Sequence, residues 1–413
     1  MDTSELVYSW NLPVGAPPAI RGPVAVLDES LRDGLQSPSV HNPSIEEKIE
    51  ILHLMEALGI NYVNLGLPCA GPRAYEHCLA LAQEIARSRM RIRPNLSGRT
   101  HEADIRPMVE IVQKVGIPMD AAIFIGSSPI RKYVEDWTDD FLVSTTEKAV
   151  KFAVSQGLSV MYVTEDTTRC DPATVKRLYS TAIANGARAI VVCDTCGYAT
   201  PDAVTKLIRF VRDEVVKPSG EEIRIDWHGH CDRGLAVTNA LIALEVGANC
   251  AHGCALGIGE RSGNTQLDQL LVNLKLLNVE PWNKQDLSRL KEYCGAVSRY
   301  TGVPIPQNYP VLGEDAFRTG TGVHAAAVIK ALRKHDIDLA DAVYSGVPAH
   351  LFGLSQVIEI GPMSGKSNVS FWLEQHGLPI TDAAVDSVFQ FAKTSDRVLS
   401  ADEILACYRK AQS

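Results

Sequence analysis

The sequence predicts a (β/α)₈ barrel, also called a TIM barrel, followed by a helix-rich C-terminal region. Two observations carry this prediction. Between residue 23 and about residue 277, eight short apolar segments alternate with amphipathic helical segments. Most of the apolar segments are hydrophobic at consecutive positions, which is typical of parallel strands that are covered on both faces. Eight repeats of this strand–helix unit indicate a closed barrel.

The eight expected strands follow one another along the chain. They span residues 24–30, 62–68, 90–96, 120–126, 158–166, 189–195, 223–230 and 250–258. The clearest helical segments span residues 44–59, 146–157, 171–186 and 234–248, and several begin after Ser, Thr or Asp and end at Gly, as helix caps require. An open doubly wound sheet is the alternative. It is less favoured because DESLRDGLQ, residues 28–36, is not the Gly-rich turn that often follows the first strand of such a sheet.

We expect three parts along the chain. Residues 1–22 form an N-terminal arm, residues 23–277 form the catalytic barrel, and residues 278–413 form a linker and helical C-terminal subdomains. The linker contains one helical segment and then a Pro-rich connector. Residues 381–410 predict one or two further helices.

The composition excludes several classes of protein. The net charge of −9 argues against general binding to nucleic acid or to an anionic membrane. No apolar run reaches membrane-spanning length, and the N-terminus does not resemble a secretory signal. The ten cysteines predict reduced thiols in a cytoplasmic protein. Cys193 and Cys196 form a CxxC, which we interpret as small core residues at a strand end rather than as a redox or zinc motif.

Polar residues gather where the expected strands end, the edge at which barrel enzymes build their active sites. They are Arg32, Asp33, Gln36, Glu165, Asp166, Asp194, Thr195, His228, His230 and, after the eighth strand, Asn264. Side chains two apart on a strand share a face, so His228 and His230 project together. Hydrogen-bonded histidines at a sheet edge are the alternative, but so many charged groups at one edge favour a metal.

Asp33, His228 and His230 would form a two-His-one-carboxylate site, with Asn264 as a further candidate ligand. These ligand types suit Mg²⁺, Mn²⁺ or Zn²⁺. Arg32 can offer its planar fork to an oxygen of the substrate. The alternative for Arg32 is a structural ion pair with Glu29 or Asp28.

Seven motifs resemble those of the metal-dependent enzymes that condense acyl-CoA with 2-oxo acids, a group that includes the 2-isopropylmalate, homocitrate and citramalate synthases. The motifs are LRDGLQ (31–36), TEDTTRCD (164–171), DTCGYATP (194–201), HGHCDRGLAV (228–237), GIGERSGN (257–264), AFRTGTGVHAAAVIK (316–330) and SGKSN (364–368). They occur in the order of the family, and the resemblance covers roughly residues 23–370.

The resemblance implies a reaction between acetyl-CoA, or a related acyl-CoA, and a 2-oxo acid. It also implies roles for individual residues. Arg32 supports the reacting oxygen, Thr195 holds the substrate carboxylate, and Gln36 and Arg99 are further candidates for binding substrate. Glu165 and His324 form an acid–base pair, and Tyr344 acts in the later hydrolytic step. The resemblance further implies a homodimer that exchanges the region around His324, and the short tail predicts no leucine-type regulatory domain.

The chain departs from the family at several positions, namely Leu35, Asn64, Leu256, Thr319 and Ala325–Ala326. These departures leave open which 2-oxo acid is used. They also leave two other hypotheses. One is a lyase that resembles hydroxymethylglutaryl-CoA lyase and cleaves a hydroxyacyl-CoA, and the other is a catalytically inactive barrel that binds a partner.

Overall fold

A computed structural model describes all residues except 1–5, 9, 12–18 and 413. The chain forms two compact units. The barrel unit comprises residues 17–285 and 292–304, and the C-terminal unit is built mainly from residues 286–291 and 305–413. Much of the expected N-terminal arm, residues 1–22, lies outside the described residues.

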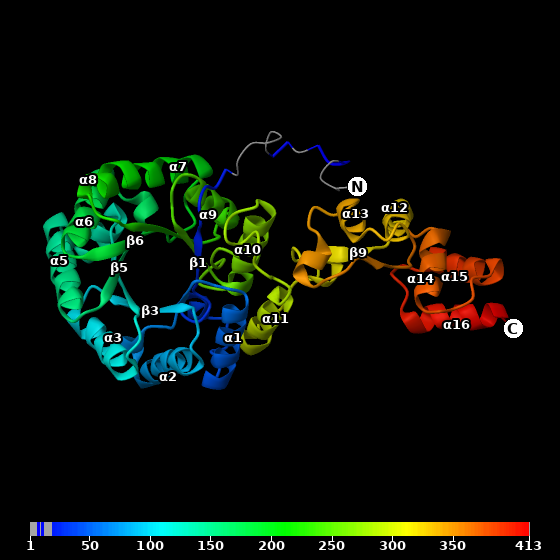
Figure 1. Ribbon diagram of the computed structural model, residues 1–413, viewed down its shortest axis with the longest axis horizontal. Coiled ribbons are helices and arrows are strands. Elements are labelled where there is room, and N and C mark those ends of the chain that lie inside the picture. The colour runs from blue at the N-terminus through cyan, green and yellow to red at the C-terminus, as the bar shows by residue number, and fades with distance from the viewer. Residues whose placement is uncertain (1–5, 9, 12–18, 413) are drawn as a thin grey trace. The chain divides into compact units, whose positions relative to one another are not determined.

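The barrel unit is a closed barrel of eight parallel strands, as the sequence predicted (Figure 1). The strands are β1 (Ala25–Asp28), β2 (Tyr62–Asn64), β3 (Arg93–Arg99), β4 (Asp120–Gly126), β5 (Ser159–Glu165), β6 (Ala187–Asp194), β7 (Arg224–Gly229) and β8 (Cys250–Gly253). Pairing of β1 with β8, from Ala25 opposite Cys250 to Asp28 opposite Gly253, closes the barrel. The fold-class prediction is therefore confirmed.

Helices surround the strands (Figure 1). They are α1 (Ile45–Ala57), α2 (Pro72–Ser88), α3 (Glu102–Val115), α4 (Pro129–Glu135), α5 (Asp139–Ser155), α6 (Pro172–Ala184), α7 (Pro201–Phe210), α8 (Lys217–Ser219), α9 (Ala236–Glu245) and α10 (Leu267–Leu276). Local capping explains several of their starts. Ser44 and Glu47 form a capping box at α1, and the side chains of Thr138 and Asp171 cap α5 and α6.

Most strands differ from their predicted bounds by one to five residues, and β2 ends at Asn64 rather than at residue 68. β3 begins and ends three residues later than expected. The eighth strand is shorter than residues 250–258, because Leu256 and Gly257 adopt φ angles of 56° and 67°. A left-handed backbone cannot continue an extended strand, so the chain turns here and leads into the loop that ends at Asn264.

Helix α11 (Leu290–Thr301) connects the two units in sequence. Its residues from Glu292 onward belong to the barrel unit, where the hydroxyl of Tyr293 donates a hydrogen bond to Asp28 and lies 3.2 Å from the Ser30 hydroxyl. The barrel unit therefore includes a helix that follows residue 277.

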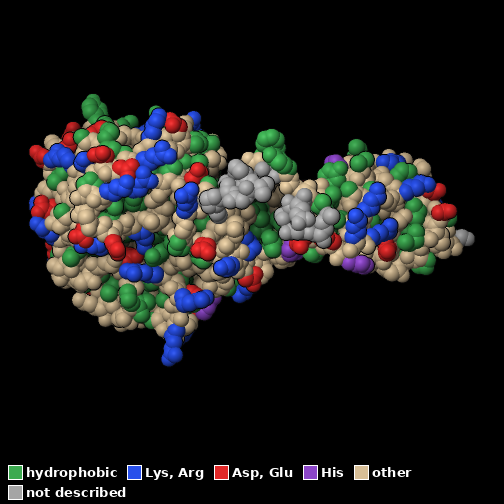
Figure 2. Space-filling view, turned by 45° about the horizontal axis from the view of Figure 1, so that its top comes forward, with side chains coloured by type: hydrophobic (Ala, Val, Ile, Leu, Met, Phe, Trp, Pro, Cys, Tyr) green, Lys and Arg blue, Asp and Glu red, His purple; other side chains and the backbone are tan. Residues whose placement is uncertain are grey.

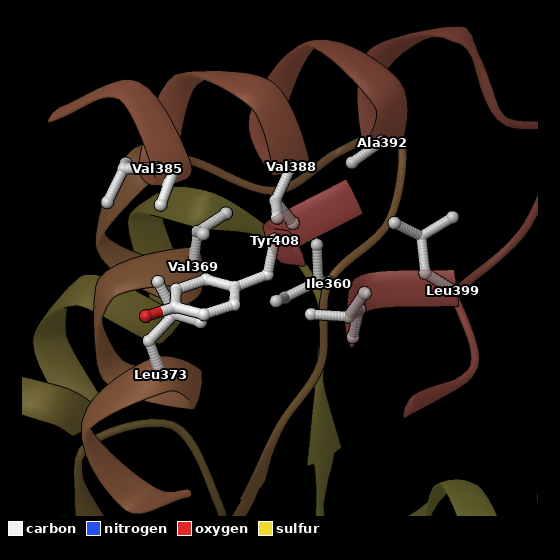
Figure 3. Close-up of a cluster of buried hydrophobic side chains, with 10 residues drawn as sticks. Ile360, Val369, Leu373, Val385, Val388, Ala392, Leu399 and Tyr408 are labelled. Atoms are coloured by element: carbon white, nitrogen blue, oxygen red, sulfur yellow. The ribbon is translucent and has the colours of Figure 1, made fainter. Parts of the chain in front are cut away.

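The C-terminal unit is mostly helical. It contains α12 (Gly322–Leu332), α13 (Ile337–Ala342), α14 (Lys366–Gln375), α15 (Asp382–Thr394), α16 (Ala401–Gln412) and a two-stranded sheet of β9 (Arg318–Thr319) and β10 (Val357–Ile358). Figure 3 shows the core of α14, α15 and α16, in which Val369, Leu373, Val388 and Tyr408 lie together. The expected helices of residues 381–410 are thus present as α15 and α16.

The surface and the cysteines agree with the composition. Figure 2 shows basic and acidic side chains interspersed over the visible face of the barrel unit. All ten cysteines are free thiols. Among the described residues, no helix is both long enough and apolar enough to cross a membrane.

Candidate active site and metal centre

A cavity of about 300 Å³ lies at the carboxyl ends of the barrel strands. It brings together seven of the predicted site residues, namely Arg32, Asp33, Gln36, Glu165, Thr195, His228 and His230. The rest of the lining is mixed. It includes apolar side chains such as those of Ala122, Phe124 and Val163, the thiol of Cys193, and the polar residues Glu29, Ser97, His252 and Glu260. The first residue of the CxxC is buried, and its thiol is free.

Three buried side chains form the centre of this cavity. The Nε2 atoms of His228 and His230 lie 3.1 Å and 3.4 Å from Oδ2 of Asp33. The ligand atoms of the three residues lie within 4.8 Å of one another, so one ion could contact all of them. Asp33 follows β1, His228 lies on β7 and His230 follows β7. Closure of the barrel therefore assembles the group.

The electrostatic surroundings keep both kinds of ligand ready to bind a cation. Burial alone would raise the pKa of Asp33, but the Arg32 guanidinium and hydrogen bonds from His228 and His230 hold it well below its usual range. Burial lowers the pKa of His228, and the attraction of Asp33 offsets only part of that effect. An ionised carboxylate and a neutral imidazole are the forms that bind metal.

Two buried polar atoms beside the three ligands have no partner among the described residues. They are Nδ1 of His230 and Oδ1 of Asn264. The backbones of these residues pair in an isolated bridge, and Nδ2 of Asn264 donates to the carbonyl of Ile258 at 3.1 Å. A buried carbonyl-type oxygen without a donor is costly. The donor set of Asp33, His228 and His230 therefore fits one divalent cation, and the unpartnered oxygen of Asn264 is a candidate for a further ligand.

Arg32 forms ion pairs beside the cavity. Its guanidinium pairs with Glu29 at 2.7 Å, which is the structural pairing considered from sequence, and lies 3.6 Å from Asp33. It also lines the cavity. A guanidinium has five donors, so this pairing leaves donors for a substrate oxygen.

A row of buried charges behind Arg32 was not predicted. Arg224 pairs with Asp226 at 2.8 Å, His252 lies 3.0 Å from Asp226, and His252 lies 3.5 Å from Glu29. These ion pairs fix Glu29, which in turn holds Arg32. One signal was present in the sequence, because Asp226 lies two residues before His228 and therefore shares its strand face.

Glu165 lies at the end of β5 and lines the same cavity. Burial raises the pKa of its carboxyl group, although the charges of Arg131 and Arg32 oppose the rise. Glu165 therefore has the environment of a general base poised nearer neutral pH than an ordinary glutamate.

Thr195 lines the same cavity, and its hydroxyl accepts a hydrogen bond from the N–H of Asp166 at 2.9 Å.

Three predicted residues lie elsewhere. Arg99 lines an adjoining cavity of about 350 Å³ and forms a two-pronged ion pair with Asp104 at 2.7 and 3.0 Å. His324 and Tyr344 belong to the C-terminal unit, where both are exposed and their rings stack with centroids 4.1 Å apart.

Comparison with known proteins identifies the family of this chain. The HMGL-like family matches residues 23–294. The 2-isopropylmalate synthase of Halothermothrix orenii is 30% identical over 382 residues, which cover 91% of this chain and 71% of that protein. The chain belongs to the HMGL-like family and, within it, to the 2-isopropylmalate synthase family. The resemblance found in the motifs is confirmed.

A further relative and a solved structure are also similar to this chain. A protein of Methanopyrus kandleri described as a probable 2-isopropylmalate synthase is 29% identical, with 90% of this chain and 69% of that one covered. The HMG-CoA lyase of Bacillus subtilis matches the structure with a TM-score of 0.58 at 19% identity, over 70% of this chain and 97% of that one. At that identity the lyase shows a shared fold.

Proposed function

We propose that this chain is an acyl-CoA:2-oxo acid C-acyltransferase. It joins the methyl carbon of acetyl-CoA, or of a related acyl-CoA, to the keto carbon of a 2-oxo acid. Hydrolysis of the thioester then releases CoA and a 2-hydroxy dicarboxylic acid. The observation that carries the proposal is one cavity lined by both the Asp33–His228–His230 cluster and Glu165, in a chain of the 2-isopropylmalate synthase family.

We propose that Asp33, His228 and His230, with the amide oxygen of Asn264, hold one divalent cation such as Mg²⁺, Mn²⁺ or Zn²⁺. When bound, such an ion supplies a Lewis acid for the oxygens of the 2-oxo acid. The ionised carboxylate of Asp33 and the neutral ring of His228 are already in the protonation states that this role needs.

Side chains of the protein bind the substrates, stabilise the developing charge and transfer protons. Arg32 donates hydrogen bonds to the reacting keto oxygen, on which negative charge develops as the carbon–carbon bond forms. Thr195 binds the substrate carboxylate, and Gln36 lines the same wall. Glu165 takes a proton from the methyl group of the acyl-CoA, because its raised pKa makes it a stronger base than an ordinary glutamate. His324 and Tyr344 act with Glu165 in proton transfer and in thioester hydrolysis.

A thiol-release assay tests this function. The protein is mixed with acetyl-CoA and a panel of 2-oxo acids, with and without divalent cation, and free CoA is measured. We expect metal-dependent CoA release with at least one 2-oxo acid, and none from a His228→Ala variant. Leu35, which makes LRDGLQ similar to the lyase motif, motivates a second assay that offers a hydroxyacyl-CoA and detects acetyl-CoA. Cleavage without condensation would establish a lyase, and no turnover in either assay would favour an inactive barrel.

A further inference from the structure

A second cavity, of about 480 Å³, adjoins the reaction cavity. Arg32, Gln36 and Leu67 line both. The second cavity lies between the N-terminal parts of α1 and α2 and is lined by three further basic side chains, Lys48, Arg73 and His77. We call it the basic cavity. Its described lining contains no Asp or Glu.

Lys48 is the unusual member of this group. Its side chain belongs to the first turns of α1, and the residue is only 5% exposed. Within the described part of the chain, its ammonium group has no hydrogen bond or ion pair. A buried charge without a partner is costly, and buried Lys is rarely found unpaired.

The charge on Lys48 persists despite its burial. Burial, with the charge of Arg73 acting in the same direction, lowers the pKa of Lys48 to about 8, so the group is still mainly protonated at neutral pH. Burial lowers the pKa of His77, and the charges of Lys48 and Arg73 lower it further. Glu46 and Glu76 act on His77 in the opposite sense, but neither lines the cavity.

The backbone adds to the positive field. Helix α2 has seventeen residues and no side-chain cap at its N-terminus. Its N-cap, Gly71, has a φ of 137°, a conformation that L side chains rarely adopt, and Gly71 and Pro72 line the basic cavity. Uncapped N–H groups at a helix N-terminus favour an anion. Arg73 is held at this edge by donating to the carbonyls of Asn42 and Pro43 at 3.3 and 3.4 Å.

We propose that the basic cavity is an oxyanion subsite, in which Lys48, Arg73, His77 and the first N–H groups of α2 bind a phosphate, phosphonate or carboxylate group of one of the two substrates. This inference rests on the proposed function for the identity of the substrates. Two groups have the required chemistry: a phosphate of the acyl-CoA and a distal acidic group on the 2-oxo acid. The shared wall at Arg32 and Gln36 places the subsite next to the reaction cavity.

Binding of inorganic phosphate to the metal-free protein, measured by calorimetry at constant ionic strength, tests the subsite without any turnover. We expect saturable binding that weakens about tenfold in Arg73→Gln and in His77→Asn, because each loses a charge-assisted hydrogen bond. Lys48→Gln should weaken binding at least as much, and the other two variants keep the test valid if it folds poorly. Arg91→Gln is the matched control, since Arg91 is 87% exposed, pairs with Glu56 and lies outside the cavity.

Kinetics of Arg73→Gln then identify the source of the anion. A KM that rises more for acetyl-CoA than for acetyl-pantetheine assigns the subsite to a CoA phosphate. A KM that rises only for 2-oxo acids with a distal acidic group assigns it to that group. Phosphate binding that is absent, or unchanged in Arg73→Gln and His77→Asn, would overturn the subsite. Weakened phosphate binding with neither KM affected would overturn its assignment to a substrate. If the protein turns over no substrate, the proposed function fails, yet phosphate binding still decides whether the subsite exists.

Discussion

At the scale of single residues, the active site depends on pairs of charges that change one another's protonation. Asp33 remains ionised although it is buried, because Arg32 and two histidines surround it. The pKa of Glu165 is raised instead, because the effect of burial exceeds that of the nearby arginines. Two carboxylates in one cavity therefore suit two different tasks, metal binding and proton abstraction.

The first prediction concerns the metal ligands. His228→Ala and Asp33→Asn should each reduce turnover by more than about a hundredfold. Mutation of residues that only hydrogen-bond to metal ligands already lowers metal affinity or activity about ten- to a hundredfold. The fold should persist, as judged by circular dichroism. Metal content measured by elemental analysis should fall from one ion per chain to almost none. A His228→Ala/His230→Ala protein that retained one ion per chain would contradict the assignment.

The second prediction concerns Glu165 and pH. A general base works when it is deprotonated, so kcat/KM should fall as the pH drops through the raised pKa of Glu165, above the value of about 4.3 for an ordinary glutamate. Arg131→Gln removes one charge that lowers this pKa, so the acidic limb of the profile should move to higher pH. The profile is measured at saturating metal. Arg91→Gln should leave the limb in place, and a limb that moved to lower pH in Arg131→Gln would exclude Glu165 as the base.

At the scale of elements, apolar packing stabilises each unit, and the barrel unit also contains buried ion pairs. In the barrel unit, apolar residues such as Leu27, Met161 and Val191 fill the interior, and ion pairs formed by Arg224, Asp226 and His252 lie at the same level of the barrel. In the C-terminal unit, α14, α15 and α16 share an apolar core. The Ala-rich start of α12 packs partly within its own unit, because Ala325 is buried against Val328 and Ile358.

The third prediction concerns the core of the C-terminal unit. Leu373 on α14 is fully buried in the cluster of Figure 3. Leu373→Ala should lower the free energy of unfolding of this unit by about 2–5 kcal/mol, through lost burial and the cavity that remains. Denaturant unfolding monitored by helical circular dichroism measures the change. Phe391→Ala on α15 is the control, because Phe391 is 41% exposed and should cost much less. Equal losses for both variants would show that this cluster is not the core of the unit.

At the scale of the whole molecule, we propose a homodimer in which His324 of one chain completes the active site of the other. Part of the support comes from the resemblance to the synthases. The other part is the surface around His324, where Val323 is 75% exposed and Tyr344, which stacks on His324, is 52% exposed. Exposed apolar and aromatic groups that adjoin one another are typical of an interaction surface. A closed two-fold pair is the commonest way to bury one.

The fourth prediction is complementation between chains. Glu165→Ala and His324→Ala proteins should each be inactive, and mixing them under conditions of subunit exchange should restore activity. One of the two sites in each mixed dimer would then contain both intact groups. CoA release measures the recovery, and differently tagged chains verify the exchange. Verified exchange without recovery would mean that the two residues do not act in a site shared between chains.

The sequence by itself determined the features that depend on local spacing. The alternation of apolar segments and capped helices predicted the barrel, and the two-residue spacing of His228 and His230 predicted their common direction. The expected site residues then followed, because parallel strands in a barrel end on the same side. Seven of them do line one cavity.

Only the tertiary structure decided which charged groups became partners. Pairing of β1 with β8 brings Glu29 beside His252, although about two hundred residues separate them in the sequence. His252 also contacts Asp226 and so links the two carboxylates. Arg99 lines a neighbouring cavity and pairs with Asp104. Lys48 and His77 reach one cavity because α1 and α2 are neighbours. Local backbone periodicity sets the face on which a side chain lies, but the energy of a buried charge depends on groups that only chain closure brings near.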